Sequence, residues 1–445
     1  MLVTGALLAP REARASGFSV AHFGGEHGNV TTNNGTAIYY NPAGIAFSEN
    51  KHAFLDALVA WRHVTYTRDA SDTPVPPGGE GANAGPASLF NIVPSPAAFA
   101  TARLDQFAVG LGLFTPFGGQ SVWKDNEQFA GNTQFPGAVD GTQRWYSISG
   151  ILRSTYASLA AAWQIPDTHL SIGVAGNLIF STVETVRARQ PSGTDALSSE
   201  GRSHLDVDGF DWSFAAGVMY EPIPDTLRVG ASYQSKPNVS GGMVLDGRLR
   251  NFFSGVSTDD AVDLHQDLPD IYRLGAQFSP VPGIELRLSG ELVRWSAFER
   301  QCLVVAGSPC ELNPDGTAAP GSTVLQNQPR DWHDAFGIRA GGSYFTSREL
   351  ELFGGLQYSS SAVPDRTLEP ALPDWHSITA EVGVRMELAE NVYAAASYSQ
   401  LISIARDNRG KSTLNQFNGP SKGPTAGGEY GQQVGYLDAN IDIEF

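Results

Sequence analysis

The chain has 445 residues, with 29 basic and 46 acidic side chains and a formal net charge of −17 at pH 7. Because nucleic-acid binding requires a basic face, this charge argues against a DNA or RNA partner. The sequence contains no apolar run of about 18 residues, which excludes membrane-spanning helices, whereas its hydrophobic fraction of 41% is compatible with a folded protein.

The first residues are typical of the end of a secretory signal. A short apolar run precedes Ala13-Arg14-Ala15, which has the small-x-small pattern of a cleavage site. We therefore expect residues 1–15 to be the remnant of a signal peptide and the mature protein to be exported.

A short segment from Asn33 to Phe47 reads neither as a strand nor as a helix. Its glycines permit turns, Pro42 lacks a backbone donor, and its apolar side chains need an enclosing surface. Because the chain that follows reads as a closed barrel, we expect residues 16–51 to be a hatch inside it and residues 52–445 to be the barrel. The alternative is an N-terminal loop packed on a soluble β-domain.

The third expected strand has an unusual inner face. Large apolar side chains along residues 107–113 alternate with Ala108, Gly110 and Gly112, which point inward with almost no side chain. Pro116 then removes a ladder donor. Small inward residues followed by a proline predict an inward kink and a gap in the wall, although the glycines could also simply make room for the hatch.

Period-two alternation recurs along the chain, for example over residues 284–292 and 378–388, but a soluble sandwich would show it too. The links favour a membrane barrel, because short ones such as Ser347-Arg348 strictly alternate with long ones such as 299–331. Counting strands on this scheme gives about 14, an even number as the class requires. Six tryptophans near strand ends could form the interfacial girdles, although any one of them could instead lie in a core: Trp61, Trp145, Trp163, Trp295, Trp332 and Trp375.

Two further features are consistent with an exported barrel. Cys302 and Cys310 lie close together in one polar stretch and could form a disulfide in an oxidising compartment, although two free thiols remain an alternative. The last expected strand alternates from Leu437 onward and ends on Phe445. A terminal aromatic residue resembles the signal by which bacterial outer-membrane proteins reach their insertion machinery.

Several motifs occur in the order found in one family. Ser16-Gly17-Phe18 comes first, Tyr40-Asn41-Pro42-Ala43-Gly44 follows, and Leu113-Phe114-Thr115-Pro116-Phe117-Gly118 comes third. With further matches up to its end, the chain resembles the FadL-type outer-membrane transporters of long-chain fatty acids and other hydrophobic compounds. The resemblance implies an all-β, transmembrane antiparallel β-barrel of about 14 strands. It also implies passive uptake of a hydrophobic ligand and a small hatch that contains Asn41, Pro42, Ala43 and Gly44.

The resemblance further implies ligand contacts. Phe18 and Phe23 match apolar positions that family members direct toward the binding pocket, although both could simply anchor the hatch. A fatty carboxylate would bind a cation, and alternation places Arg187, His333 and Arg339 inward, where each could instead join a polar network in the lumen. His333 stands where the family commonly has Lys. Because neutral His holds a carboxylate less firmly, neutral aromatics or hydrocarbons remain an alternative ligand class.

A hydrophobe that leaves an apolar pocket for water loses about 25 cal/mol per Å² of apolar surface, so a side exit into the bilayer is favoured. Family members are thought to release ligand sideways, and Ala108, Gly110, Gly112 and Pro116 are the predicted lateral exit. Replacing the two glycines with bulky residues is expected to reduce uptake without preventing insertion.

We expect a monomer in the bacterial outer membrane whose partners are a hydrophobic small molecule, membrane lipid and, through Phe445, the insertion machinery. No cofactor is expected, and no metal, because His22 and His27 lack a third ligand in a suitable pattern. The sequence has no catalytic motif, and we expect no enzyme. The alternatives from other classes are an outer-membrane lipid hydrolase, whose Ser and His could meet in space, and a structural barrel.

Overall fold

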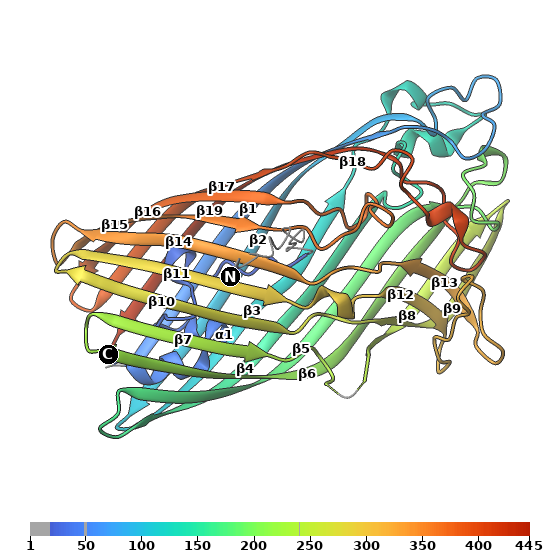
Figure 1. Ribbon diagram of the computed structural model, residues 1–445. Helices are drawn as coiled ribbons and strands as arrows, with labels where there is room; N and C mark the ends of the chain where they lie inside the picture. Colours follow the sequence, from blue (N-terminus) through green and yellow to red (C-terminus); the bar gives the residue numbers. More distant parts are fainter. Residues whose placement is uncertain (1–17, 49–50, 240) are drawn as a thin grey trace, which may run out of the picture.

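The computed structural model describes residues 18–48, 51–239 and 241–445. The predicted signal remnant at residues 1–15 lies outside the described residues, as do Ser16 and Gly17. The described chain forms one antiparallel sheet of 19 strands, most of which surround a common interior (Figure 1). Within these residues, no helix is long and apolar enough to cross a membrane.

In the described part of the chain, 14 strands form a closed barrel, as the alternating link lengths predict. The first strand pairs with the last from His52↔Glu444 to Arg68↔Gly428, which closes the cylinder. The barrel strands are β1 (Lys51–Arg68), β2 (Gly85–Leu104), β3 (Phe107–Val122), β4 (Ser149–Ile165), β5 (Leu170–Arg189), β6 (Gly201–Ile223), β7 (Leu227–Gln234), β10 (Ile271–Val281), β11 (Ile284–Val293), β14 (Ala335–Phe345), β15 (Leu350–Ser359), β16 (Ser377–Ala389), β17 (Val392–Ser403) and β19 (Gly428–Glu444).

The remaining strands extend the structure at the end of the barrel that carries the long connections (Figure 1). They are β8 (Met243–Phe253), β9 (Val256–Gln266), β12 (Arg300–Val305), β13 (Val324–Pro329) and β18 (Arg406–Asp407). Short 3-10 helices lie in the connections: η3 (Glu127–Phe129), η4 (Pro136–Asp140), η5 (Leu197–Ser199), η6 (Trp295–Ala297) and η7 (Leu414–Gln416). A disulfide joins Cys302 of β12 to Cys310, with a Cα–Cα distance of 6.2 Å.

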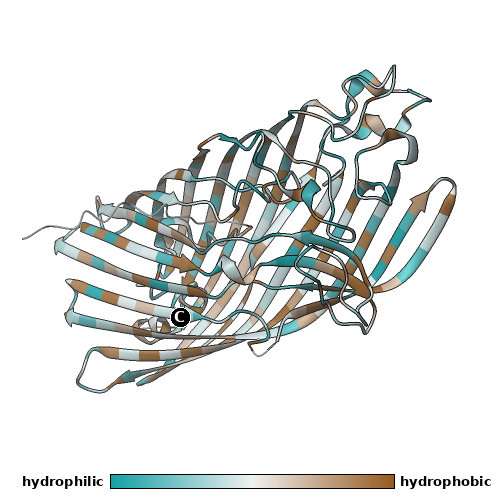
Figure 2. Cartoon of the chain, turned by 45° about the vertical axis from the view of Figure 1, so that its right-hand side comes forward, coloured by the Kyte–Doolittle hydropathy of each residue, from teal (hydrophilic) through white to brown (hydrophobic). Residues whose placement is uncertain are grey.

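The two faces of the strands differ as the period-two pattern predicts. In β19, Leu437 and Ile441 are 53% and 42% exposed on the outer surface, whereas Asp438 is buried inside the barrel. Apolar and polar residues alternate along the strands in the same way around the barrel (Figure 2). Because such an extensive apolar outer surface is stable only against lipid, the pattern identifies a transmembrane barrel and not a soluble sandwich.

The girdle prediction is wrong for most of its tryptophans. Four of them are buried and point away from the outer surface: Trp145, Trp295, Trp332 and Trp375. Their rings fill space inside the barrel or beneath the long connections, where strand alternation no longer decides which side they face. Trp163 does lie on the outer surface, stacked on Phe107, and Phe180 packs against Phe210 nearer the long-loop end. These outer aromatic residues have the position of interfacial belts.

The hatch occupies the interior of the barrel toward the end with short turns (Figure 1). Its elements are η1 (Gly25–His27), α1 (Ala37–Tyr40) and η2 (Pro42–Phe47), and nearly all of their residues are buried. No sheet partner is available to this segment across most of its length, so its backbone folds into short helical turns that satisfy their own hydrogen bonds.

The Asn-Pro-Ala sequence fixes the hatch to the wall. The Asn41 Oδ1 accepts a hydrogen bond from the backbone N–H of Ala43 at 3.2 Å, and Pro42 begins η2 where a missing N–H breaks no helical bond. The Asn41 Nδ2 donates to the backbone oxygen of Val218 at 3.0 Å. A Cβ on Gly217 would lie 2.0 Å from the Asn41 Oδ1, so this wall position requires glycine.

Candidate functional site

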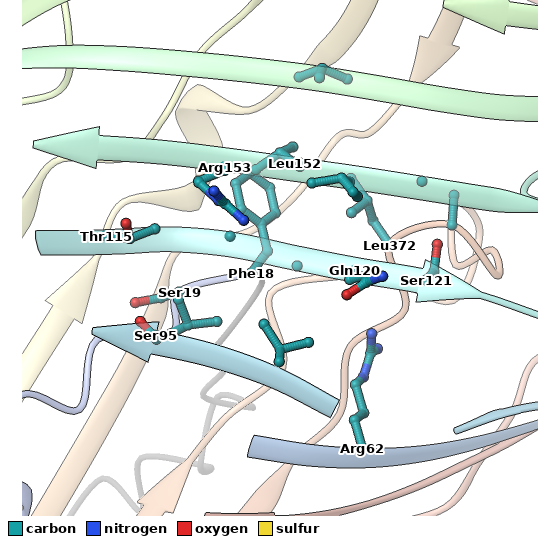
Figure 3. A pocket seen from close by; sticks show the side chains of 18 of the residues that line it. Phe18, Ser19, Arg62, Ser95, Thr115, Gln120, Ser121, Leu152, Arg153 and Leu372 are labelled. Atoms are coloured by element: carbon teal, nitrogen blue, oxygen red, sulfur yellow. The ribbon is translucent and has the colours of Figure 1, made fainter. Parts of the chain in front are cut away.

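A cavity of about 930 Å³ lies in the barrel on the long-loop side of the hatch. Phe18 and Val20 of the hatch line it at one end, and Tyr146 and Leu372 line it from the long connections (Figure 3). Apolar side chains dominate its wall: Leu58, Phe114, Leu152, Val183, Leu264, Leu303, Trp332 and Val434. A cavity of this size and lining can enclose a hydrophobic small molecule.

Two arginines lie in this apolar wall with only neutral hydrogen-bond partners. The Arg62 Nε donates to the Gln432 Oε1 at 2.7 Å, and the Arg187 guanidinium donates to the Gln326 side chain. Neither donates a hydrogen bond to a carboxylate in the described chain, although Asp374 acts electrostatically on Arg62 and Glu369 on Arg187. By contrast, Arg330 in the same wall is neutralised by an ion pair with a buried glutamate. Arg62 and Arg187 are therefore the inward-facing cations of the wall that are available to an anionic ligand.

Arg62 is a candidate that the sequence reasoning missed. The alternation along β1 could have revealed it, since buried Asp56 and Leu58 share its face of the strand. Arg187, which alternation did select, lies in the cavity wall as expected. The pairing of their strands directs both side chains toward the barrel interior, so both guanidinium groups lie at the cavity.

The other two predicted cations lie elsewhere. The Arg339 Nε is 2.7 Å from the Glu26 Oε2 of the hatch, so this arginine anchors the hatch and is absent from the cavity lining. His333 is exposed, and its neighbour Trp332 lines the cavity instead. The prediction that His333 faces inward is corrected, because His333 lies in the connection before β14, which begins at Ala335, and strand alternation does not apply there.

Phe18 and Phe23 have different surroundings. Phe18 lines the cavity and packs in an aromatic cluster with Trp295, Phe298 and Trp332, at ring centroid distances of 4.8, 5.6 and 5.9 Å. Phe23 is 2% exposed within the hatch, packed against its aromatic residues and the wall, and is absent from the cavity lining. Phe18 thus has the position of a ligand contact, and Phe23 that of an anchor.

The barrel wall has a gap between β2 and β3. Their ladder stops at Ala98↔Leu113, and contact returns only where the Val122 N–H donates to the Asn91 Oδ1 at 3.1 Å. We call the gap between these two contacts the window. It lies within strands that elsewhere pair on both sides, so the sequence around it must weaken the ladder.

Prolines account for the interrupted ladder. Pro94 and Pro96 on β2 and Pro116 on β3 lack the N–H that pairing requires. Between Phe114 and Phe117, the register of β3 with β4 also shifts by a bulge, which bends β3 locally. The predicted effect of Pro116 therefore occurs, with support from two prolines on the facing strand.

The cavity continues through the window to the outer surface. Leu113 and Ile151 are 54% and 38% exposed on the membrane-facing side, and both also line the cavity. Pro94 and Pro96 line it from the opposite edge. A ligand in the cavity therefore has a lateral path toward lipid that avoids the aqueous ends of the barrel.

The position of the predicted exit requires a correction. Ala108, Gly110 and Gly112 are paired on both sides, with β2 and with β4, so the wall is closed where they lie. A Cβ on Gly110 would lie 2.8 Å from the Ile38 Cδ1 of the hatch. These glycines make room for the hatch, and the opening begins beyond them, at Pro116.

The N-terminal part of the hatch lies along the free edge of β3. The Val20 N–H donates to the Pro116 oxygen at 2.9 Å, and the Gly118 N–H donates to the Phe18 oxygen at 3.1 Å. Ser19 forms an isolated bridge between them, so residues 18–20 take hydrogen bonds that β2 would otherwise supply. Ser19 and Ser95 lie beside the window in Figure 3.

A network of buried charges holds the rest of the hatch. Glu26 is 1% exposed, and its carboxylate lies 2.7 Å from Arg339 and 3.5 Å from Arg287. A Cβ on Gly341 or on Gly355 would lie 2.0 or 2.4 Å from this carboxylate, so the two wall glycines form the slot that receives it. Burial also raises the pKa of the neighbouring hatch phenol of Tyr39, which Arg273 only partly offsets. The contacts of Glu26 therefore fix this part of the hatch to the wall.

A polar cavity of about 210 Å³ lies on the other side of the hatch, and one cluster beside it combines His52, Asp442 and Glu444. The His52 Nδ1 lies 3.0 Å from the Asp442 Oδ1, and its Nε2 lies 2.5 Å from the Ser48 Oγ. Both ring nitrogens are thus occupied. Ser48 is 2% exposed, so the arrangement ties the end of the hatch to the β1–β19 seam and presents no accessible nucleophile.

A plugged transmembrane barrel with an apolar cavity and an opening toward lipid defines a class of outer-membrane channels for hydrophobic compounds. The family model of the outer membrane protein transport protein (OMPP1/FadL/TodX) matches residues 5–425, and the chain belongs to this family. It is 22% identical over 438 residues to the outer membrane protein NMB0088 of Neisseria meningitidis serogroup B, covering 90% of this chain and 89% of that one.

Solved structures are similar to the fold over almost its whole length. A Pseudomonas aeruginosa FadL homologue superposes with a TM-score of 0.78 at 17% identity, covering 98% of this chain and 100% of that one. The Ralstonia pickettii toluene transporter TbuX gives a TM-score of 0.65 at 15% identity, covering 97% and 99%. The P. putida toluene transporter TodX gives 0.65 at 14% identity, covering 98% and 99%. The protein is a transporter of hydrophobic compounds in the outer membrane, with the long connections outside and the short turns in the periplasm.

Proposed function

We propose that this transporter takes up long-chain fatty acids or similarly built carboxylate amphiphiles. The observation that supports this is the pair Arg62 and Arg187, two guanidinium groups that hydrogen-bond only to neutral side chains in a mainly apolar cavity. A buried cation without an opposite charge is costly, and a carboxylate head group would supply that charge while the acyl chain fills the apolar part.

The path follows from the same geometry. The ligand enters the cavity from the side of the long connections, contacts Phe18, and leaves through the window into the membrane. An acyl chain with about 400 Å² of apolar surface would lose about 10 kcal/mol on entering water, so a route through the wall is strongly favoured over one through the aqueous lumen. No energy source is required, because the ligand moves from one apolar environment to another. We infer that the protein is a monomer and that the barrel insertion machinery recognises Phe445, which is 73% exposed.

A second candidate ligand class is neutral aromatic hydrocarbons. Two of the similar structures are toluene transporters, and the aromatic cluster around Phe18 offers ring faces and edges to such a ligand. The lipid hydrolase considered from the sequence has less support, since the family consists of transport channels.

Ligand binding by purified protein in mild detergent separates the two classes. Native mass spectrometry identifies the retained molecule, and hexadecanoate, hexadecanol and toluene then compete for its site. Displacement by hexadecanoate at concentrations where hexadecanol and toluene have little effect is expected. Preferential binding of toluene would instead assign the transporter to aromatic hydrocarbons, and failure of all three to bind would contradict uptake of hydrophobes through this cavity.

A further inference from the structure

One arginine stands on the outer face of the barrel at the edge of the window. Arg153 lies on β4, exposed, between Ile151 and Thr155, and it also lines the cavity. Alternation places its neighbour Leu152 inside, where it is buried. Figure 3 shows Arg153 and Leu152 on this strand beside the window. An exposed guanidinium on a membrane-facing surface is costly unless it lies at the depth of the lipid head groups.

The registers place Arg153 at that depth. It pairs with Thr182 of β5, two residues beyond Phe180, whose ring packs against Phe210 at 4.9 Å in the outer aromatic belt. Toward the long connections the outer face becomes polar, with Glu184 exposed on the same face of β5. Exposed Ile151 pairs with Glu184 one step nearer the long connections, so apolar and charged residues mix here and Arg153 lies at the edge of the apolar band. There it can meet an anionic head group while an attached chain lies in the band.

Nothing in the described protein neutralises this charge. No described carboxylate forms an ion pair with Arg153. Glu184, the diagonal neighbour on β5, lies 3.2 Å from the His204 Nε2 instead, and Asp208 in the same row lies one strand further away, since it pairs with Thr182. On the other side Arg153 pairs with Gly118, which has no side chain to cover it. The guanidinium is therefore open toward the window and toward lipid.

Hydroxyl groups complete the surroundings. The Thr115 Oγ1 lies 3.2 Å from the Thr155 Oγ1, and both residues line the same opening. Arg62, on the inward face of β1, and Arg153, on the outward face of β4, both line the cavity (Figure 3). An anion that passes the window would thus move from one guanidinium to another past neutral polar groups.

We propose that Arg153 forms a binding site for an anionic head group on the membrane side of the window. The head group is either the carboxylate of the departing ligand, in which case the site rests on the proposed function, or the phosphate of an outer-leaflet lipid. In the first case Arg153 favours the release of anionic amphiphiles over neutral ones of equal length. In the second it holds a lipid beside the exit.

The variant Arg153→Gln tests this site, with Arg348→Gln as a matched control, because Arg348 is an exposed arginine in a short turn at the opposite end. In the uptake arm, cells expressing each form take up hexadecanoate and hexadecanol. R153Q is expected to lower the ratio of the two rates about fivefold, which corresponds to about 1 kcal/mol for an exposed ion pair. Arg153→Lys is expected to restore part of the ratio, and R348Q to leave it unchanged.

In the lipid arm, native mass spectrometry compares the phosphate-bearing lipid retained by each purified form. A lower uptake ratio assigns the site to the ligand, and loss of retained lipid alone assigns it to a lipid phosphate. Equal slowing of hexadecanoate and hexadecanol, or no difference from R348Q in either arm, would overturn the proposal. If the unmodified protein takes up neither compound, the proposed function fails, and the lipid arm still decides whether Arg153 binds an anion.

Discussion

Replacement of Glu26 by Ala tests how the hatch is held. The Glu26 carboxylate is buried and neutralises Arg339 at 2.7 Å and Arg287 at 3.5 Å. Arg339 has a second carboxylate at 3.2 Å in Glu381, and Arg287 has one at 2.7 Å in Glu285. Removal of one partner from a buried charge network costs about 3–5 kcal/mol, because the remaining charges stay desolvated.

This cost makes docking of the hatch less favourable and does not lower the stability of the barrel, because the wall residues of the network remain in place. A loss of about 3–5 kcal/mol shifts the ratio of docked to undocked hatch by about two to four orders of magnitude. Because the hatch fills the lumen, E26A is expected to convert a closed protein into an ion-conducting one. Conductance across a planar lipid bilayer measures this change directly.

Glu349→Ala is the matched control, because Glu349 is exposed in a short turn. Heat-modifiable migration in unboiled detergent samples checks that the barrel of each variant is folded. If E26A remains as closed as E349A while its barrel is intact, the charge network does not hold the hatch, and the reasoning is refuted.

Three further predictions concern the cavity, the hatch and the long connections. Arg62→Met is expected to weaken hexadecanoate binding about 10- to 100-fold in a fluorescence competition titration, with hexadecanol unaffected, since a charged hydrogen bond contributes about 1.5–3 kcal/mol. Gly110→Val is expected to raise bilayer conductance by displacing the hatch, because even a Cβ would lie 2.8 Å from it. Burial opposes ionisation of Asp365, but Lys411 and Arg406 hold its pKa below the ordinary 3.8, so protease resistance of this connection is expected to fall below about pH 4.

Each of these three has an outcome that contradicts it. Equal loss of hexadecanoate and hexadecanol binding would show that R62M acts on the cavity shape and not on charge. An unchanged conductance of G110V would mean that the hatch adapts to the added methyl groups. Protease resistance that stays constant down to pH 2 would show that the ion pairs of Asp365 contribute nothing to the order of the connection.

Much of the fold could be predicted from the sequence because a membrane barrel obeys two simple periodicities. Side chains alternate between lipid and lumen, which the exposed Leu437 and buried Asp438 confirm. Link lengths alternate between the two ends, which gave the strand number correctly. Both signals are local, so they need no knowledge of tertiary contacts.

The residues of the site were harder to predict from the sequence than the fold, because their positions depend on where the strand alternation stops. His333 lies in the connection between β13 and β14, outside the alternating strand that begins at Ala335. Arg339 has the expected inward direction, but Glu26, its partner from the hatch, is more than 300 residues away in the sequence. The glycines of β3 suggested an exit, whereas their role depends on Ile38 packing against them from the hatch.

Only part of the sequence signal for the window was recognised, namely the proline on β3 and not the two prolines on β2. Pro116 indicated a weak ladder on β3, but the ladder has two sides, and Pro94 and Pro96 on β2 remove donors from the facing edge. Only the pairing of the two strands shows that these prolines face the same opening.

If ligand leaves the cavity through the window, closing the window must stop uptake, and this test is the most direct one. Cysteines in place of Ser95 and Thr115, which lie at the window on opposite strands, can be joined by a bifunctional thiol reagent (Figure 3). Each single-cysteine variant, treated in the same way, is the control. The cross-linked protein is expected to bind hexadecanoate normally but to take it up at least about tenfold more slowly. Unchanged uptake with the window closed would contradict a lateral exit and require a path through the hatch.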